Sequence, residues 1–497
     1  MRTMRAPGPS RWSAASLVAL ATGGVLCTTC DRRVGGLDAN LDVPDAPIDI
    51  ALDCETPYEF VLEPGPTERC PPWDLVPHPT TTLSLAPVGE PYVVWEWSPV
   101  DDPIIDSAVA RQYGTDISGA GLGPDGSLWV ITPESTAVVV IDHDGQTRWA
   151  QQYVLPGLRN HTVEGPITVA PDGTGFFDRG YVLGATVPAE VGVLHVDREG
   201  LAFERRVRES SFTGETGRQF LAVAPDGVVY YESATESDGT SWLVRSCAGS
   251  TDAYEWRLGV RYPSNPGLQA LTGTADHEGG LIASFTAVGA VVRVSPRGDV
   301  SWLTAPLPYD AERSYYARAL AEGTILFFDG DYSYGTQALG GEVLWRSPPA
   351  FELMFDPLAR MWTATDTGWR VLDRTGNDVV SIREGDFGER RVFSADGSAL
   401  VARGRTVRRI DGATGEIAWS LDVGLPTDGA QILALDVDGR LYVAISGLGV
   451  TDFWGTVQRV VAIQTDVVAP RNVCVVNNGQ RCNRHNNSSL YDYGPVY

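Results

Sequence analysis

Two stretches of this chain carry the same pattern: GPDGSLWVITPESTAVVVIDHDGQTRW over residues 123–149 and FSADGSALVARGRTVRRIDGATGEIAW over residues 393–419. In each stretch an Asp-Gly turn precedes an apolar run, and a second glycine-containing turn leads to a tryptophan. Asp-Gly between apolar runs favours a tight reversal between antiparallel strands. Self-similarity of this kind indicates a repeat architecture.

Weaker copies of the turn extend the repeat along the chain. Asp-Gly or Glu-Gly turns recur at Gly173, Gly227, Gly279 and Gly439. The gap of 118 residues between Gly279 and Gly397 is long enough for three units, and degraded copies around Gly323 and Arg360 fill it. Each unit holds several short segments rich in β-branched and aromatic residues, which favour strands. The pattern predicts an all-β chain with a single eight-bladed β-propeller over residues 85–470, with seven blades as the alternative.

The last unit lacks its final strand. After RVVAIQTD (residues 459–466) no turn followed by tryptophan occurs, whereas EPYVVWEW (residues 90–97) stands alone before the first full unit. We expect this N-terminal strand to complete the last blade and close the ring, because closure pairs strand edges that would otherwise be exposed.

The stretch IDGATGEIAW (residues 410–419) resembles the A-x-D-x-x-T-G-x-x-x-W repeat of the PQQ-like (quinoprotein-type, BamB-like) β-propeller superfamily. The resemblance covers residues 88–468, with one near-complete copy. It implies a fold and also a role for the tryptophans, which dock neighbouring blades in that family. By position these are Trp97, Trp149, Trp256, Trp302, Trp345 and Trp419.

The N-terminus has the features of an export signal. Three arginines precede an apolar stretch of thirteen residues (14–26), which suits a secretory signal peptide over residues 1–30. Cys30 is the favoured lipidation site, Cys27 the alternative, and cleavage without a lipid anchor stays open. An acidic, proline-rich tether over residues 31–84 and an Asn-rich C-terminal tail over residues 471–497 are expected to flank the propeller. These features predict an exported protein in the periplasm or outer envelope of a Gram-negative bacterium.

The charge and the cysteines limit the partners and the compartment. A net charge of −25 disfavours nucleic acids and anionic membrane surfaces, and the chain has no lysine, which excludes lysine-based catalysis. We expect two local disulfides in an oxidising compartment, formed within the pairs Cys54/Cys70 and Cys474/Cys482, with cross-pairing between the two ends as the alternative. Cys247 is expected to be a buried thiol. Contact with the membrane is expected only through the lipid anchor, and the chain is expected to be a monomer.

No motif for catalysis or cofactor binding stands out. The vicinal disulfide of quinoprotein dehydrogenases and the C-x-x-C-H of attached haem are both absent from the sequence. The turns DHDG (residues 142–145) and DVDG (residues 436–439) lack the spacing of a calcium loop, so we expect plain turns. His161 is the one histidine placed as in propeller arylsulfotransferases, but a polar loop position is favoured. We therefore expect no cofactor, no metal and no catalytic residues.

Three functions remain. The favoured one is an exported, non-catalytic scaffold that binds other cell-envelope proteins. The alternative is a propeller enzyme of the quinoprotein dehydrogenase, lyase or arylsulfotransferase kind, with its site at the channel mouth. A carbohydrate- or peptidoglycan-binding module is the third, suggested by the aromatic residues Tyr315, Tyr316, Tyr332 and Tyr334.

Overall fold

The computed structural model describes a chain built from strands, with no helix among the described residues. The described residues are 59–79, 85–99, 119–131, 137–152, 161–181, 192–200, 202–206, 219–224, 226–232, 240–247, 253–261, 271–275, 279–285, 290–303, 315–319, 324–329, 334–338, 343–346, 353–358, 360–365, 368–373, 376–383, 390–426, 428–447 and 457–470. Within these ranges, no helix is long and apolar enough to cross a membrane.

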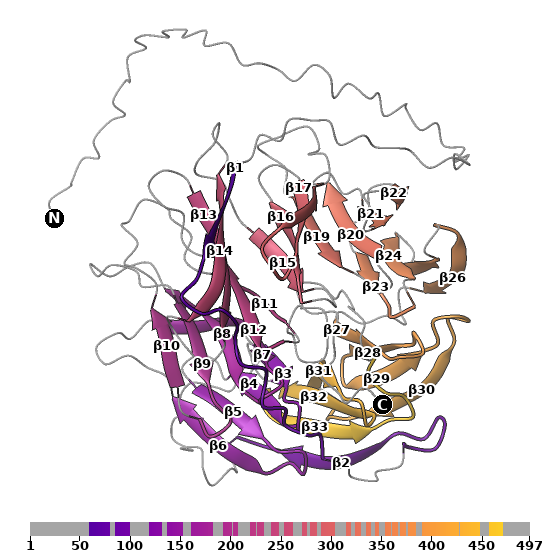
Figure 1. Cartoon of the computed structure of the whole chain (residues 1–497). Coiled ribbons are helices and arrows are strands. Elements are labelled where there is room, and N and C mark those ends of the chain that lie inside the picture. Colours follow the sequence, from indigo (N-terminus) through magenta and orange to yellow (C-terminus); the bar gives the residue numbers. More distant parts are fainter. Residues whose placement is uncertain are drawn as a thin grey trace, which may run out of the picture. The chain divides into compact units, whose positions relative to one another are not determined.

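The described strands form eight antiparallel sheets, most of them made of four consecutive strands (Figure 1). We number the sheets in chain order. The first four contain β3 (Gly119–Leu122), β4 (Leu128–Ile131), β5 (Ala137–Ile141) and β6 (Thr147–Gln152); β7 (His161–Val169), β8 (Gly175–Tyr181), β9 (Gly192–Val196) and β10 (Ala202–Arg206); β11 (Gln219–Val223), β12 (Val228–Glu232), β13 (Thr240–Cys247) and β14 (Tyr254–Arg261); and β15 (Leu271–Ala275), β16 (Leu281–Phe285), β17 (Ala290–Val294) and β18 (Val300–Leu303).

The later sheets repeat this plan. They contain β19 (Tyr315–Ala319), β20 (Thr324–Asp329), β21 (Tyr334–Ala338) and β22 (Val343–Arg346); β23 (Leu353–Phe355), β24 (Met361–Thr365), β25 (Gly368–Leu372) and β26 (Asp378–Arg383); β27 (Arg390–Phe393), β28 (Ala399–Arg403), β29 (Thr406–Ile410) and β30 (Ile417–Asp422); and β31 (Asp428–Leu435), β32 (Arg440–Gly447) and β33 (Val457–Gln464).

Two N-terminal strands complete this arrangement at the outer edges of sheets. As expected from the sequence, β2 (Tyr92–Trp97) pairs antiparallel with β33, which gives the eighth sheet its fourth strand (Figure 1). β1 (Glu59–Pro64) pairs with β14 as a fifth strand of the third sheet. The sequence did not indicate this strand, because EFVLEP lacks the turn and tryptophan of the repeat.

The core lies between successive sheets, as in a β-propeller. Trp129 of the first sheet packs with Ile167 and Val169 of the second, and all three side chains are buried. Leu433 and Tyr442 of the eighth sheet share another cluster with residues of the first sheet. The first sheet is therefore apolar on both faces, which explains the near-continuous run of Val and Ile in its central strands.

Candidate functional site

Residues 65–79 and 85–90 form a segment, here called the strap, that contacts the Asp-Gly turns of four sheets. Its residues lie against Gly227, Gly173, Gly126 and Gly439, which belong to the third, second, first and eighth sheets. At Gly227, φ is 91° and the carbonyl of Pro71 is so close that any side chain would collide with it. Glycine is therefore required at this turn for two reasons: its positive φ, and the close approach of the strap.

Directional contacts hold the strap to these turns. The indole N–H of Trp73 donates to the carbonyl of Ala224 at 2.9 Å, and the ring packs in a buried cluster with Phe176 and Tyr231. Further along, the amide of Val76 donates to the carbonyl of Pro171 at 2.9 Å. Residues 59–79, expected from the sequence to be part of an acidic tether, are thus held on the sheets through Trp73 and Val76.

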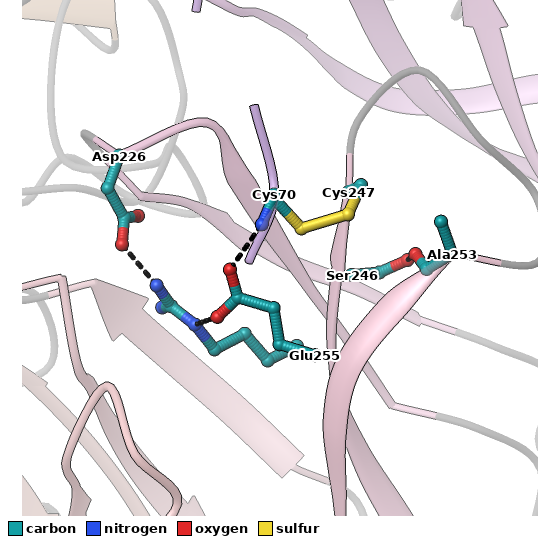
Figure 2. The surroundings of a disulfide bond; sticks show 7 residues. Cys70, Asp226, Ser246, Cys247, Ala253 and Glu255 are labelled. Atoms are coloured by element: carbon teal, nitrogen blue, oxygen red, sulfur yellow. Dashed lines mark hydrogen bonds and ion pairs between the residues drawn. A yellow bond between two sulfur atoms is a disulfide. The ribbon is translucent and has the colours of Figure 1, made fainter. Parts of the chain in front are cut away.

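A disulfide links the start of the strap to the third sheet and corrects the expected cysteine pairing. Cys70 bonds to Cys247, at the end of β13, with a Cα–Cα distance of 5.2 Å (Figure 2). Neither a Cys54–Cys70 bond nor a free Cys247 thiol is therefore present. The reason is β1, because its pairing with β14 brings the following residues to the β13–β14 turn. Cys27, Cys30, Cys54, Cys474 and Cys482 lie outside the described residues.

The surroundings of this disulfide are charged and well connected. One carboxylate oxygen of Glu255 accepts the amide N–H of Cys70 at 2.6 Å, and the other accepts the guanidinium of Arg245 at 2.8 Å (Figure 2). Arg245 also donates to the hydroxyl of Tyr230 at 2.6 Å and pairs with Asp226. This buried arginine joins the disulfide to the Asp-Gly turn of the third sheet.

The predicted docking tryptophans make hydrogen bonds to neighbouring sheets where their side chains are described. The indole of Trp97 donates to Thr147 at 2.8 Å and that of Trp149 to the carbonyl of Arg198 at 2.8 Å. Trp256 and Trp419 donate in the same way to the carbonyl of Pro296 and the carboxylate of Asp466. The side chains of Trp302, Trp345 and His161 lie outside the description, although their backbones belong to β18, β22 and β7.

Further along the strap, two histidines and two aspartates meet; we call His78, His143, Asp436 and Asp438 the His–Asp cluster. His78 comes from the strap, His143 from the β5–β6 turn, and the aspartates from the β31–β32 turn. The Nε2 of His78 lies 3.0 Å from Oδ2 of Asp436, and the Nε2 of His143 lies 2.6 Å from Oδ2 of Asp438. The two imidazole rings meet edge to face with centroids 5.8 Å apart.

Hydrogen bonding assigns the protons of His143. Arg440 NH1 lies 3.0 Å from its Nδ1, and a guanidinium can only donate, so Nδ1 accepts and Nε2 carries the proton given to Asp438. Both ring nitrogens of His143 are therefore engaged. This geometry suits a residue that orients Asp438 rather than one that moves a proton to a substrate.

The carboxylates of the cluster are also oriented by the turn that carries them. Oδ1 of Asp436 accepts the amide N–H of Val437 at 2.6 Å, and Oδ1 of Asp438 accepts that of Arg440 at 3.0 Å. The Oδ2 atoms are thereby directed toward the histidines. The ligand atoms of His78, Asp436 and Asp438 all lie within 4.8 Å of one another, so these three residues are a candidate metal-binding group.

From the sequence, DHDG and DVDG are expected to be two separate, plain turns. The structure brings the two turns together and adds His78, which lies 358 residues from Asp436. The local spacing of each turn carries no sign of this meeting. The one available signal was the rarity of histidine, since the chain has only six.

Comparisons with known proteins yield similarity at the level of fold. No protein-family model matches the chain, and no curated protein matches it. Among solved structures, it is similar to virginiamycin B lyase from Staphylococcus aureus (12% identity, 76% of this chain and 99% of that chain, TM-score 0.38). It is also similar to the C-terminal WD40 domain of Sif2 (9% identity, 76% and 99%, TM-score 0.45) and to BamB from Moraxella catarrhalis (16% identity, 70% and 85%, TM-score 0.33). These are propeller proteins, both enzymes and non-enzymes, and similarity at this level is no basis for assigning an activity to the chain.

Proposed function

We propose that this protein is an exported eight-bladed β-propeller, closed by β2, that acts as a non-catalytic scaffold for other cell-envelope proteins. The eight described sheets and the pairing of β2 with β33 support the blade number and the closure. The disulfide between Cys70 and Cys247 supports export, because such bonds persist in oxidising compartments. A lipid at Cys30 would hold the scaffold at a membrane surface, and the mass of the mature N-terminal peptide tests this.

The observation that carries the scaffold role is an exposed apolar surface on β2, the outer strand of the eighth sheet. Tyr92, Val93 and Val94 of this strand are 46%, 40% and 38% exposed, and Val88 at the end of the strap is 89% exposed. Three consecutive apolar side chains reach solvent here because the pairing of β2 with β33 shifts register between Val93 and Trp95. Contiguous exposed apolar residues mark interaction sites on soluble proteins, whereas single ones do not.

The register shift also indicates how a partner would bind. A bulge on an edge strand disfavours the addition of a further strand. We therefore expect the partner to pack against the side chains of β2 rather than to extend the sheet. The proposed partner is an envelope protein with an apolar surface of matching size.

The experiment compares two variants of the full chain, each purified from the envelope after crosslinking. Tyr92→Asp/Val94→Asp places charges on β2, and Val379→Asp places one on β26, where Val379 is 41% exposed. We expect the first variant to lose its crosslinked partner at least about tenfold and the second to keep it, with unchanged thermal unfolding for both. Equal loss or equal retention in the two variants would contradict the proposal.

A further inference from the structure

We propose that His78, Asp436 and Asp438 bind one divalent transition-metal ion, which fastens the strap to the eighth sheet. The site is independent of the scaffold role. It joins residues that are far apart in the sequence, from the strap on one side and a single turn on the other. The side chain of Asp436 is fully buried, and those of Asp438 and His78 are 10% and 14% exposed.

The first argument is the tautomer of His78. Its Nδ1 lies 3.0 Å from the carbonyl of Pro79, and a carbonyl can only accept, so Nδ1 carries a proton. In the neutral ring, Nε2 then presents a lone pair to the carboxylate of Asp436 at 3.0 Å. Two acceptors at this distance require a cation, either a proton or a metal ion. A histidine that binds a metal through one nitrogen commonly donates its other N–H to a backbone carbonyl, as His78 does.

The second argument is the charge of the two aspartates. Asp436 and Asp438 bring two carboxylates close together in a largely buried position, which is unfavourable unless a cation lies near. Arg440, the arginine of the same turn, directs its NH1 to Nδ1 and the carbonyl of His143. A divalent ion would offset both negative charges.

The third argument is the support around the ligands. His143 donates to Asp438 at 2.6 Å, and Arg440 holds His143 in place. Outer contacts of this kind orient ligand groups in metal sites. One imidazole with two carboxylates favours the borderline ion Zn²⁺, or the harder transition-metal ion Mn²⁺, over Ca²⁺, which prefers an all-oxygen shell of six to eight ligands.

The experiment measures metal binding by titration calorimetry on the full oxidised chain after chelation and dialysis, with Zn²⁺, Mn²⁺ and Ca²⁺ each as the only metal. We expect one Zn²⁺ per chain in the wild type. His78→Ala and Asp438→Asn should weaken Zn²⁺ binding at least about 30-fold. Asp436 is left intact because its full burial makes a substitution there a risk to folding. Asp144→Asn is the matched control: this exposed carboxylate lies 3.8 Å from His143 and should not affect the affinity.

Two further readouts separate a metal site from a plain ion pair. Zn²⁺ should slow amide exchange in the strap around Val76 and His78 in the wild type but not in His78→Ala. His78→Cys should restore Zn²⁺ binding and weaken Mn²⁺ binding, because a thiolate prefers the softer ion. Absence of stoichiometric binding in the wild type, or equal Zn²⁺ affinity in wild type and His78→Ala, would overturn the proposal and leave a His78–Asp436 ion pair.

Discussion

The turns Asp356–Arg360 and Asp436–Arg440 share one sequence pattern and neutralise a buried aspartate in different ways. In the sixth sheet, the guanidinium of Arg360 binds Oδ2 of Asp356 at 2.6 Å, and the indole of Trp362 donates to the same oxygen. In the eighth sheet, Arg440 binds His143 instead, and Oδ2 of Asp436 faces His78 of the strap. Both aspartate side chains are fully buried.

The position between the two charged residues accounts for part of this difference. Leu358 occupies it in the sixth sheet and is 54% exposed, whereas Asp438 occupies it in the eighth and binds His143. One turn is self-sufficient, and the other depends on residues from the strap and the first sheet. A pattern such as D-x-x-x-R therefore predicts the turn but not the partner of its carboxylate.

The largest expected effect comes from releasing the strap at its other end. Cys70→Ala/Cys247→Ala opens a covalent loop across 177 residues, and the loop-entropy estimate is a loss of about 5 kcal/mol of unfolding free energy. Urea unfolding of the oxidised protein and the variant measures it. Amide exchange should also rise around Asp436–Arg440, which the strap contacts, more than around Asp356–Arg360. Equal exchange at both turns would show that the eighth-sheet turn does not depend on the strap.

The second prediction tests the self-sufficient turn. Arg360→Met leaves Asp356 buried without its cation and should cost about 3–4 kcal/mol of unfolding free energy. Asp356→Asn/Arg360→Met removes the charge as well and should recover much of that loss. Urea unfolding measures both variants. A loss of less than about 1 kcal/mol of unfolding free energy in Arg360→Met alone would contradict the assignment of Arg360 as the required partner.

Some features of the molecule could be predicted from the sequence, and others could not. The strands and the pairing of β2 with β33 could be predicted, because alternation, turn residues and the missing final strand are local signals. The Cys70–Cys247 bond and the meeting of His78 with Asp436 could not, since both depend on how β1 and the strap cross several sheets. A proline-rich acidic segment such as residues 65–79 has the composition of a tether, whereas in the structure Cys70 and Trp73 are buried and bound to the third sheet.

The third prediction introduces a second carboxylate, the counterpart of Asp438, into the Asp356–Arg360 turn. Leu358→Asp reproduces the Asp436–Asp438 pair in the sixth sheet without a histidine from the strap. Because Leu358 is exposed, the unfolding free energy should change by less than about 0.5 kcal/mol. Calorimetry should detect no additional Zn²⁺ site in this variant. A second bound ion would mean that the strap histidine is not needed, and the contrast between the two turns would fail.

The smallest expected effect concerns Asp125 of the first sheet and Asp172 of the second, which precede the turn glycine as Asp438 does in the eighth sheet. Burial would raise the pKa of Asp125, but the hydrogen bond from Ser127 and the charge of Arg148 at 2.7 Å outweigh it, so the pKa lies below the ordinary value of 3.8. For Asp172, burial raises the pKa above 3.8, and the nearby carboxylate of Asp74 on the strap adds to the shift. The first carboxylate pairs with Arg148, and no described arginine pairs with the second.

The two shifts have opposite consequences for stability. A lowered folded-state pKa gives stability that is present above 3.8 and is lost as pH falls through the folded-state pKa, whereas a raised one gives stability that is present below 3.8 and is lost as pH rises. From about pH 3 to about pH 6, the unfolding free energy of Asp125→Asn should therefore fall relative to wild type, and that of Asp172→Asn should rise. Taking the difference in unfolding free energy from wild type at each pH removes the contributions that the other carboxylates make to both proteins. Slopes of the same sign would show that the arginine does not decide the behaviour of these turn carboxylates. Opposite slopes would extend the contrast between the sixth and eighth sheets to a third and fourth turn of the repeat.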